Sequence, residues 1–274
     1  MKSITDSLKE YARGITGGLL FSLPLLYTME VWWLGFSLQP YHLLIYIAVT
    51  FLLLLGYNNY AGVHEDATWK EVIIDSVEEI GIGVILSIIV LWLLGRIDFS
   101  EMRIDEIMGK TIVETMTVAI GVSVGTAQLG GEETNGDNND RNISGSGQAV
   151  LALCGSVIIA GNVAPTEEIP MIAMEIDPLR LLMLVIVSLL LGAVILFFSN
   201  FTKGHKLPSG KIALAVMFET FTVYIIALGS SAFMLWFFGR FNDIHFTTGL
   251  SQVIVLGLPA VLGASAGRLL IKQQ

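Results

Sequence analysis

Apolar runs long enough to cross a bilayer recur along the whole chain, and they constrain its fold more than any other feature. A transmembrane helix needs about 20 mostly apolar residues. Of the 274 residues, 54% are hydrophobic and only 14% are charged, whereas a soluble domain carries about 25% charged residues. The sequence therefore predicts an all-α polytopic membrane protein. We expect eight spans, at about 14–35, 41–57, 72–95, 107–129, 148–176 (interrupted), 179–200, 212–239 and 250–271.

A polar segment at residues 130–147 separates the fourth and fifth predicted spans. It is acidic and rich in Asn, Gly and Ser, a composition that cannot bury a core. We interpret it as a flexible cytoplasmic linker. It divides the chain into a first repeat, residues 1–129, and a second repeat, residues 148–274.

The distribution of basic residues predicts the orientation of the chain. If the N-terminus is cytoplasmic, the larger share of the 15 Lys and Arg residues falls in cytoplasmic segments. Both termini are then expected in the cytoplasm, and the protein is expected in the cell (inner) membrane as a multi-pass protein. Residues 1–14 are polar, so the first span is expected to be retained and not cleaved as a signal peptide.

Short motifs occur twice in the same order and indicate an internal duplication. Because each half has an even number of predicted spans, the two four-helix repeats are expected to be parallel and related by a pseudo-twofold axis along the membrane normal. The motif Leu91–Arg96 recurs 144 residues later as Leu235–Arg240. The same offset pairs Asp75 with Glu219, and we expect these two acids to face each other across the axis. The matched pairs are Leu91–Arg96 with Leu235–Arg240, Gly121–Gly125 with Gly263–Gly267, and Met29–Val31 with Met174–Ile176.

The two glycine motifs, Gly121–Gly125 and Gly263–Gly267, also fit the G-x-S-x-G pattern of hydrolase nucleophiles. That pattern needs a strand-to-helix elbow and a histidine partner, and no histidine lies deep in a predicted span. We favour a packing role instead, in which the small residues of these motifs let helices approach closely. We expect no enzyme activity.

The single cysteine, Cys154, excludes an internal disulfide, and the net charge of -9 argues against nucleic acid as a partner.

Acidic residues in or beside the predicted spans outnumber the cations near them. Almost no Lys or Arg lies at comparable depth, so we expect that internal ion pairs cannot neutralise the set. An ionised carboxylate at the bilayer centre costs about 2.5–3.5 kcal/mol on insertion scales, which leaves protonation, water-filled surroundings or bound cations. The ten acids are Glu30, Glu71, Asp75, Glu78, Glu79, Glu114, Glu167, Glu168, Glu175 and Glu219.

The stretch Ala160–Pro170 combines a predicted helix break with adjacent carboxylates. Pro165 and Pro170 each remove a helix hydrogen bond, which frees backbone carbonyls beside Glu167 and Glu168. Broken helices of this kind bind ions in transporters. The alternative is a short loop that joins two spans.

Residues 160–168 resemble the ion-binding helix-break motif of the calcium/cation exchanger superfamily. That resemblance implies a cation site lined by Asn162, Glu167 and Glu168. The whole chain resembles an uncharacterised family of bacterial integral membrane proteins in its length, its number of spans and its glycine-rich first span. The second resemblance implies no activity.

Together these features predict a cation transport protein, either a proton-coupled exchanger or a cation-selective channel. The alternative is a non-transporting membrane scaffold or sensor whose acids are structural. The expected partners are the lipid bilayer and the cation, with no other cofactor, and a homo-oligomer is left open. The predicted ion-binding or pathway residues are Glu30, Asp75, Glu79, Glu114, Asn162, Glu167, Glu168 and Glu219. Among these, Asp75, Glu167, Glu168 and Glu219 could hold a metal such as Ca²⁺, and Na⁺, K⁺ or H⁺ are the other candidate cations.

Overall fold

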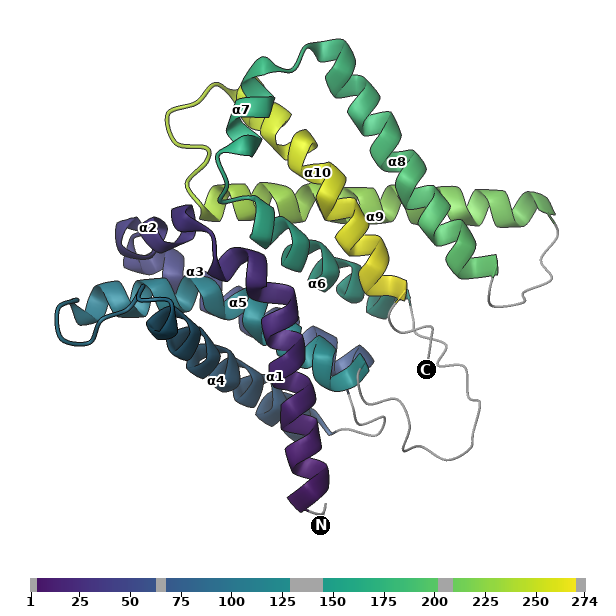
Figure 1. The fold of residues 1–274 in the computed structure, drawn as a ribbon. Helices are drawn as coiled ribbons and strands as arrows, with labels where there is room; N and C mark the ends of the chain where they lie inside the picture. Colours follow the sequence, from purple (N-terminus) through teal and green to yellow (C-terminus); the bar gives the residue numbers. More distant parts are fainter. Residues whose placement is uncertain (1–3, 63–67, 129–144, 202–208, 270–274) are drawn as a thin grey trace. The chain divides into compact units, whose positions relative to one another are not determined.

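The computed structural model describes residues 4–62, 68–128, 145–201 and 209–269, and its regular secondary structure within these ranges is helical (Figure 1). The predicted all-α class is thus confirmed for the described residues. The predicted linker lies outside them, apart from the first residues of α6. The helices are α1 (Ile4–Leu26), α2 (Met29–Ser37), α3 (Pro40–Ala61), α4 (Trp69–Leu93), α5 (Ile104–Gln128), α6 (Gly145–Val163), α7 (Glu168–Glu175), α8 (Pro178–Phe201), α9 (Ser209–Phe237) and α10 (Phe246–Leu269).

Seven of the described helices, α3, α4, α5, α6, α8, α9 and α10, are long and apolar enough to cross a membrane. Helices α1 and α2 meet the same criterion only as a pair, because the chain bends by 90° between Leu26 and Met29. Counting this bent pair as one span gives the expected eight. The first predicted span is therefore broken, and Pro24 lies in the last turn of α1, just before the bend.

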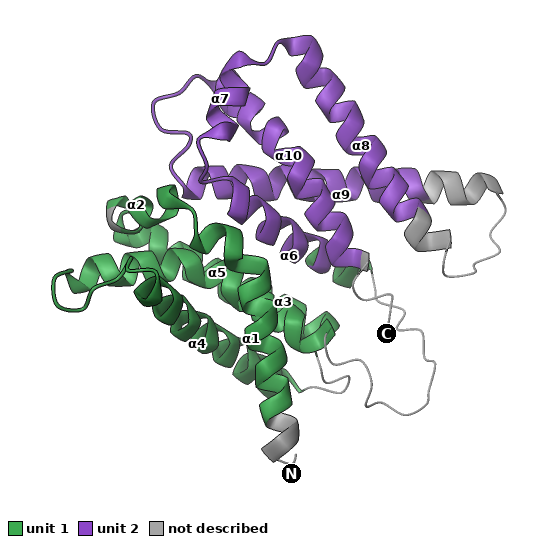
Figure 2. Cartoon of the chain, viewed as in Figure 1, with its two compact units in different colours: residues 1–150 green, residues 151–274 purple. Residues whose placement is uncertain are grey.

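The chain divides into two compact units, residues 1–150 and residues 151–274 (Figure 2). In unit 1, helix α5 is the central element, and α1, α2, α3 and α4 all pack against it. Nearly every residue of α5 from Gly109 to Gly125 is buried. The side chains of α5 are mostly small, which allows neighbouring helices to approach from all sides.

In unit 2, α10 is the central element. Helices α7, α8 and α9 pack against it, and α8 also contacts α9. Helix α6 contacts α10 through glycines, because a Cβ on Gly155 would collide with the backbone of Gly263 and Gly267. In unit 1, Gly17 of α1 meets Gly121 and Gly125 of α5 in the same way. The predicted packing role of both glycine motifs is therefore confirmed.

The outer helices expose large apolar side chains, as a lipid-facing surface requires. On α4 these include Ile74, Ile85 and Trp92, and on α8 they include Leu182 and Leu190. A continuous apolar surface of this kind on a soluble protein would drive aggregation, whereas lipid accommodates it.

The repeated motif around Gly95 and Gly239 ends a helix in the same way in both units. Both glycines have positive φ, 66° and 68°, which glycine adopts without strain. The amide of Arg96 donates to the carbonyl of Leu91 at 2.7 Å, and the amide of Arg240 donates to Leu235 at 2.8 Å. This is the Schellman arrangement, and it explains why the motif is kept at both sites.

The contact between Gly17 and α5 yields a stability prediction. In a Gly17→Ala variant the new Cβ would meet the backbone of Gly121 and Gly125, and we expect a loss of about 1–3 kcal/mol from overpacking. The matched control is Gly81→Ala, since a Cβ at Gly81 meets nothing within 4 Å. Thermal unfolding in detergent, followed by circular dichroism, measures both. Equal unfolding temperatures for the two variants would contradict the packing described.

Candidate functional site

Glu114 is the most deeply buried acid of unit 1. Its side chain is 0% exposed, and within the part of the chain that the structure describes neither carboxylate oxygen has a hydrogen-bond partner. A buried polar group without a partner is expensive, and more so when it is charged. Glu114 therefore has no hydrogen bond or ion pair among the described residues that would account for its burial.

Glu114 lies on the face of α5 that is turned toward the bent pair α1–α2. A Cβ on Gly18 would meet Val118, and a Cβ on Gly35 would meet Lys110. Positions 110, 114, 118, 121 and 125 are spaced by three or four residues and form one stripe of the helix. Glu114 thus falls between the contact with α1 and the contact with α2, near the level of the bend.

A second buried carboxylate, Glu79 on α4, belongs to a polar cluster at the junction of three helices. The Asn58 side-chain amide, from α3, donates to Glu79 Oε2 at 2.7 Å and to Ser76 Oγ at 3.1 Å. The hydroxyl of Ser123, from α5, donates to Asn58 Oδ1 at 2.8 Å. All four residues are buried. The cluster therefore holds a carboxylate that is hydrogen-bonded, in contrast to Glu114.

Two further acids of the predicted site lie in unit 1 at partly buried positions. Asp75 precedes Glu79 by one turn of α4, and Glu30 is in the first turn of α2. Both are less buried than Glu79 or Glu114. Neither acid is enclosed as Glu79 and Glu114 are.

In unit 2, Glu219 of α9 forms an ion pair with Arg268 of α10, with an N–O distance of 3.0 Å. The Arg268 side chain is only 6% exposed and that of Glu219 is 31% exposed. The expectation that no cation lies at the depth of the acids is therefore wrong for Glu219. Arg268 lies in the last turn of α10, and the packing of α9 against α10 brings it to the carboxylate.

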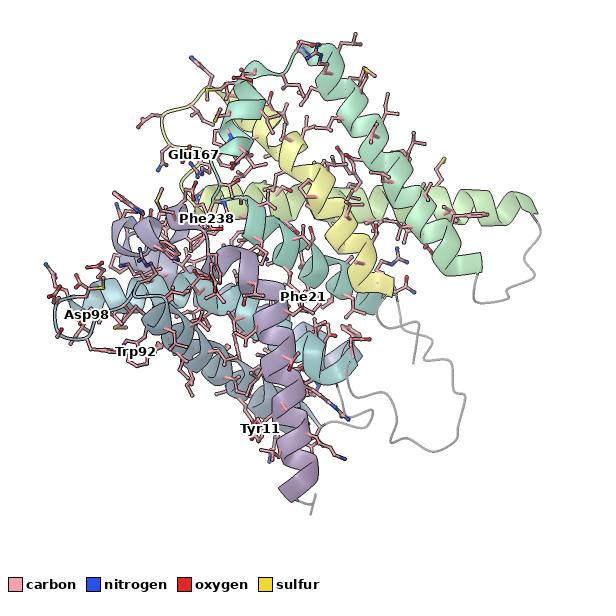
Figure 3. The ribbon with its side chains drawn as sticks, viewed as in Figure 1. Tyr11, Phe21, Trp92, Asp98, Glu167 and Phe238 are labelled. Carbon is pink, nitrogen blue, oxygen red and sulfur yellow. The ribbon has the colours of Figure 1, made fainter. Side chains whose placement is uncertain are left out.

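Glu167, labelled in Figure 3, lies at the connection between α6 and α7 and is exposed. Glu168, the first residue of α7, is also exposed. Glu167 binds Arg240 at 2.9 Å, and Arg240 also donates to the carbonyl of Pro165. The pKa of the Glu168 carboxyl is held below its usual range, first by its own backbone amide and then by the Thr166 side chain. The proline-containing stretch is thus a short connection pinned by Arg240, which agrees with the loop alternative.

Asn162, the other predicted ligand in this stretch, is buried near the end of α6. Its side-chain amide donates to the carbonyl of Ile158 at 2.7 Å, one turn back on the same helix. This bond ties the side chain to its own backbone, so the structure gives Asn162 a local role in α6.

The predicted metal ligands of unit 2 do not share one site. Among the described residues, no three or more His, Cys, Asp or Glu side chains are placed to hold a metal ion. Within unit 2, Glu219 is bound at Arg268, whereas Glu167 is bound at Arg240 beyond the end of α9. The length of α9 between these two points is about 27 Å at 1.5 Å per residue. A shared site for Glu167 and Glu219 is therefore excluded.

The sequence identified the acids of the site but not the residues that form hydrogen bonds or ion pairs with them. Asn58, Ser76 and Ser123 were not predicted to act with Glu79, because their separation in sequence gives no sign that they meet. Arg240, the partner of Glu167, could have been noticed in the sequence because it ends a repeated motif. The third repeat match is wrong: Met29–Val31 begin α2, whereas Met174 and Glu175 end α7.

Comparison with known proteins gives a family but no characterised relative. Residues 10–271 match the model of the family described as "Putative integral membrane protein (DUF2391)". No curated protein matches the chain, and no solved structure matches it.

Proposed function

We propose that this chain, which belongs to the DUF2391 family of integral membrane proteins, is a cation transport protein in which buried carboxylates of unit 1 bind the cation. The observation that carries the proposal is Glu114, fully buried and without a hydrogen-bond partner in the described part of the chain. A carboxylate in this state must be compensated by something mobile, because no fixed donor or cation among the described residues reaches it.

The counterpart of Glu114 in unit 2 supports a functional origin for the acid. At the offset of 142 that relates the two glycine motifs, Glu114 corresponds to Leu256, which is fully buried in α10. At the offset of 144, Glu79 corresponds to Val223, which is also buried. An apolar side chain therefore satisfies the packing at both positions of unit 2. The carboxylates of unit 1 are not needed to build such a bundle.

The bend between α1 and α2 supports the same function. A break in a helix leaves backbone carbonyls and amides without their helical partners, and transporters use such breaks at ion sites. Glu114 lies on the stripe of α5 that faces this bent pair. At this bend the carbonyls of Pro24 and Leu26 already accept hydrogen bonds from Thr28 Oγ1 and Trp32 Nε1, so the bend supports the proposal by its position beside Glu114 and not by free ligands.

The finer architecture is part of the proposal. We place two four-helix repeats in parallel, related by a pseudo-twofold axis along the membrane normal, in the bacterial inner membrane with both termini cytoplasmic. The equivalent Schellman ends and the equivalent glycine contacts of α1–α5 and α6–α10 support the duplication. The facing of Asp75 and Glu219 stays a prediction, as does the local resemblance to the calcium/cation exchangers.

Flux measurements on the full-length protein in proteoliposomes test the proposal. We expect cation movement above that of empty liposomes under an imposed ion or pH gradient. Movement of protons strictly tied to a second cation indicates an exchanger, and a dissipative current indicates a channel. Absence of flux of H⁺, Na⁺, K⁺ and Ca²⁺ in both formats would refute cation transport.

A scaffold or sensor is the second candidate, and the ion pairs of unit 2 favour it. Glu219 with Arg268 and Glu167 with Arg240 neutralise acids by fixed cations, which is a structural use of charge. This candidate predicts that neutral isosteres at Glu79 and Glu114 leave function unchanged. Transport predicts the opposite result at these two positions.

A further inference from the structure

The oxygen atoms around Glu114 are already engaged in the helix. Three threonines of α5 lie within one turn of it, and each hydroxyl donates to a backbone carbonyl of α5. Thr111 donates to Ile107 at 2.8 Å, Thr115 to Thr111 at 2.7 Å, and Thr117 to the carbonyl of Glu114 itself at 3.2 Å. Among the described residues, Glu114 belongs to no group of three or more His, Cys, Asp or Glu side chains that could hold a metal.

Metal cations need more oxygen ligands than this site presents. Ca²⁺ takes six to eight oxygen ligands and Mg²⁺ requires octahedral coordination. The Glu114 side chain is 0% exposed, and α1 lies against the α5 backbone at Val118, one turn away, which leaves little room for a hydration shell. A proton needs one oxygen and no shell.

The titratable groups that surround Glu114 leave its charge uncompensated. From α3, the buried Tyr46 phenol interacts with it electrostatically. On α5, Lys110 lies one turn away, but its Nζ binds Glu106 at 2.8 Å and the carbonyl of Arg96 at 3.1 Å. Glu30 is the one acid of α2. Residues 14–26 of α1 and 80–93 of α4 contain no titratable side chain.

We propose that the cation bound by Glu114 is a proton, so that Glu114 is a neutral carboxylic acid in the resting protein. Binding forms one O–H bond on the carboxylate and removes its charge from the apolar interior. Release breaks that O–H bond and transfers the proton to a water molecule, which opening of the α1–α2 bend would admit. This inference rests on the proposed function for its purpose, since it names the cation of the same site.

Infrared spectroscopy of the full-length protein in lipid tests this inference without measuring transport. The difference spectrum of wild type minus Glu114→Gln at neutral pH should contain the carbonyl stretch of a carboxylic acid. Na⁺, K⁺ and Ca²⁺ should leave that band unchanged at fixed pH. The matched control is Glu101→Gln, which removes an exposed acid outside the helices and should remove a carboxylate band instead. A carboxylate band for Glu114, or loss of the acid band on adding one of these cations, would overturn the inference.

A second measurement needs no variant. Dicyclohexylcarbodiimide is apolar and reacts with protonated carboxyls, whose O–H adds across one C=N bond so that no atom is lost. We expect the adduct on the peptide that contains Glu114, with labelling that falls as the pH rises. Protection by Na⁺, K⁺ or Ca²⁺ at fixed pH would overturn the inference.

The outcomes separate the inference from the function. An acid band at Glu114 in a protein that moves no cation supports the proton site and refutes transport. Flux that depends on Glu114 together with a carboxylate band supports transport and refutes the proton.

Discussion

Glu114→Gln is expected to lower cation flux by at least about tenfold while the protein becomes more stable to heat. Glutamine has nearly the same shape as glutamate, but it cannot bind a cation or carry a transferable proton. A loss of about 1.4 kcal/mol of transition-state stabilisation already gives a tenfold lower rate. At neutral pH the unfolded acid is ionised, so folding must either bury its charge without a hydrogen-bond partner among the described residues or bind a proton, and glutamine requires neither.

The rise in stability separates this prediction from simple damage to the fold. A gain of about 1 kcal/mol corresponds to a melting temperature about 2–4 °C higher for a chain of this size class. Flux per reconstituted molecule and thermal unfolding in detergent measure the two effects. Glu101→Gln, at an exposed position outside the helices, should change neither. A Glu114→Gln protein that melts earlier and transports normally would assign the acid a structural role.

Glu219→Gln is expected to destabilise unit 2, in contrast to Glu114→Gln. Arg268 is 6% exposed, so the variant would leave a buried guanidinium without the carboxylate that now binds it at 3.0 Å. Removing one partner of a buried ion pair costs about 3–5 kcal/mol. We expect about 2 kcal/mol here, because the 31% exposed Glu219 side chain is partly screened by solvent. Thermal unfolding of the purified protein measures the loss.

The double variant Glu219→Gln with Arg268→Gln provides the internal control. It removes both charges and should regain most of the stability, because no buried charge is then left without its partner. The exposed ion pair of Arg103 with Asp105 gives the matched comparison, and Arg103→Gln should leave the unfolding temperature nearly unchanged. If the double variant loses as much stability as the two single variants together, the ion pair does not hold α9 to α10.

The elements of the fold that could be predicted are those determined by local sequence. Long apolar runs predicted the transmembrane helices because a bilayer admits few other structures. The glycine motifs predicted close helix contacts, and the small residues of α5 explain its central place. The burial of Glu114 could also be predicted, since it stands alone between Lys110 and a long apolar stretch.

Features that depend on tertiary packing could not be predicted. The ion pair of Glu219 with Arg268 joins residues 49 positions apart, and the Asn58–Glu79 bond joins residues 21 apart on two helices. The helix break was expected only at Ala160–Pro170, although Pro24 gave the same local signal in the first span. The site was predicted in the second unit because Glu167 and Glu168 follow the break there, but both side chains are exposed.

The flux of Glu114→Asp compared with that of Glu114→Gln, in the same lipid and at the same protein density, tests the central claim most directly. Aspartate keeps the carboxylate and shortens the side chain, whereas glutamine keeps the length and loses the acid. We predict measurable flux for Glu114→Asp and only the rate of empty liposomes for Glu114→Gln. Equal or greater flux for Glu114→Gln would contradict the claim that the buried carboxylate binds the transported cation.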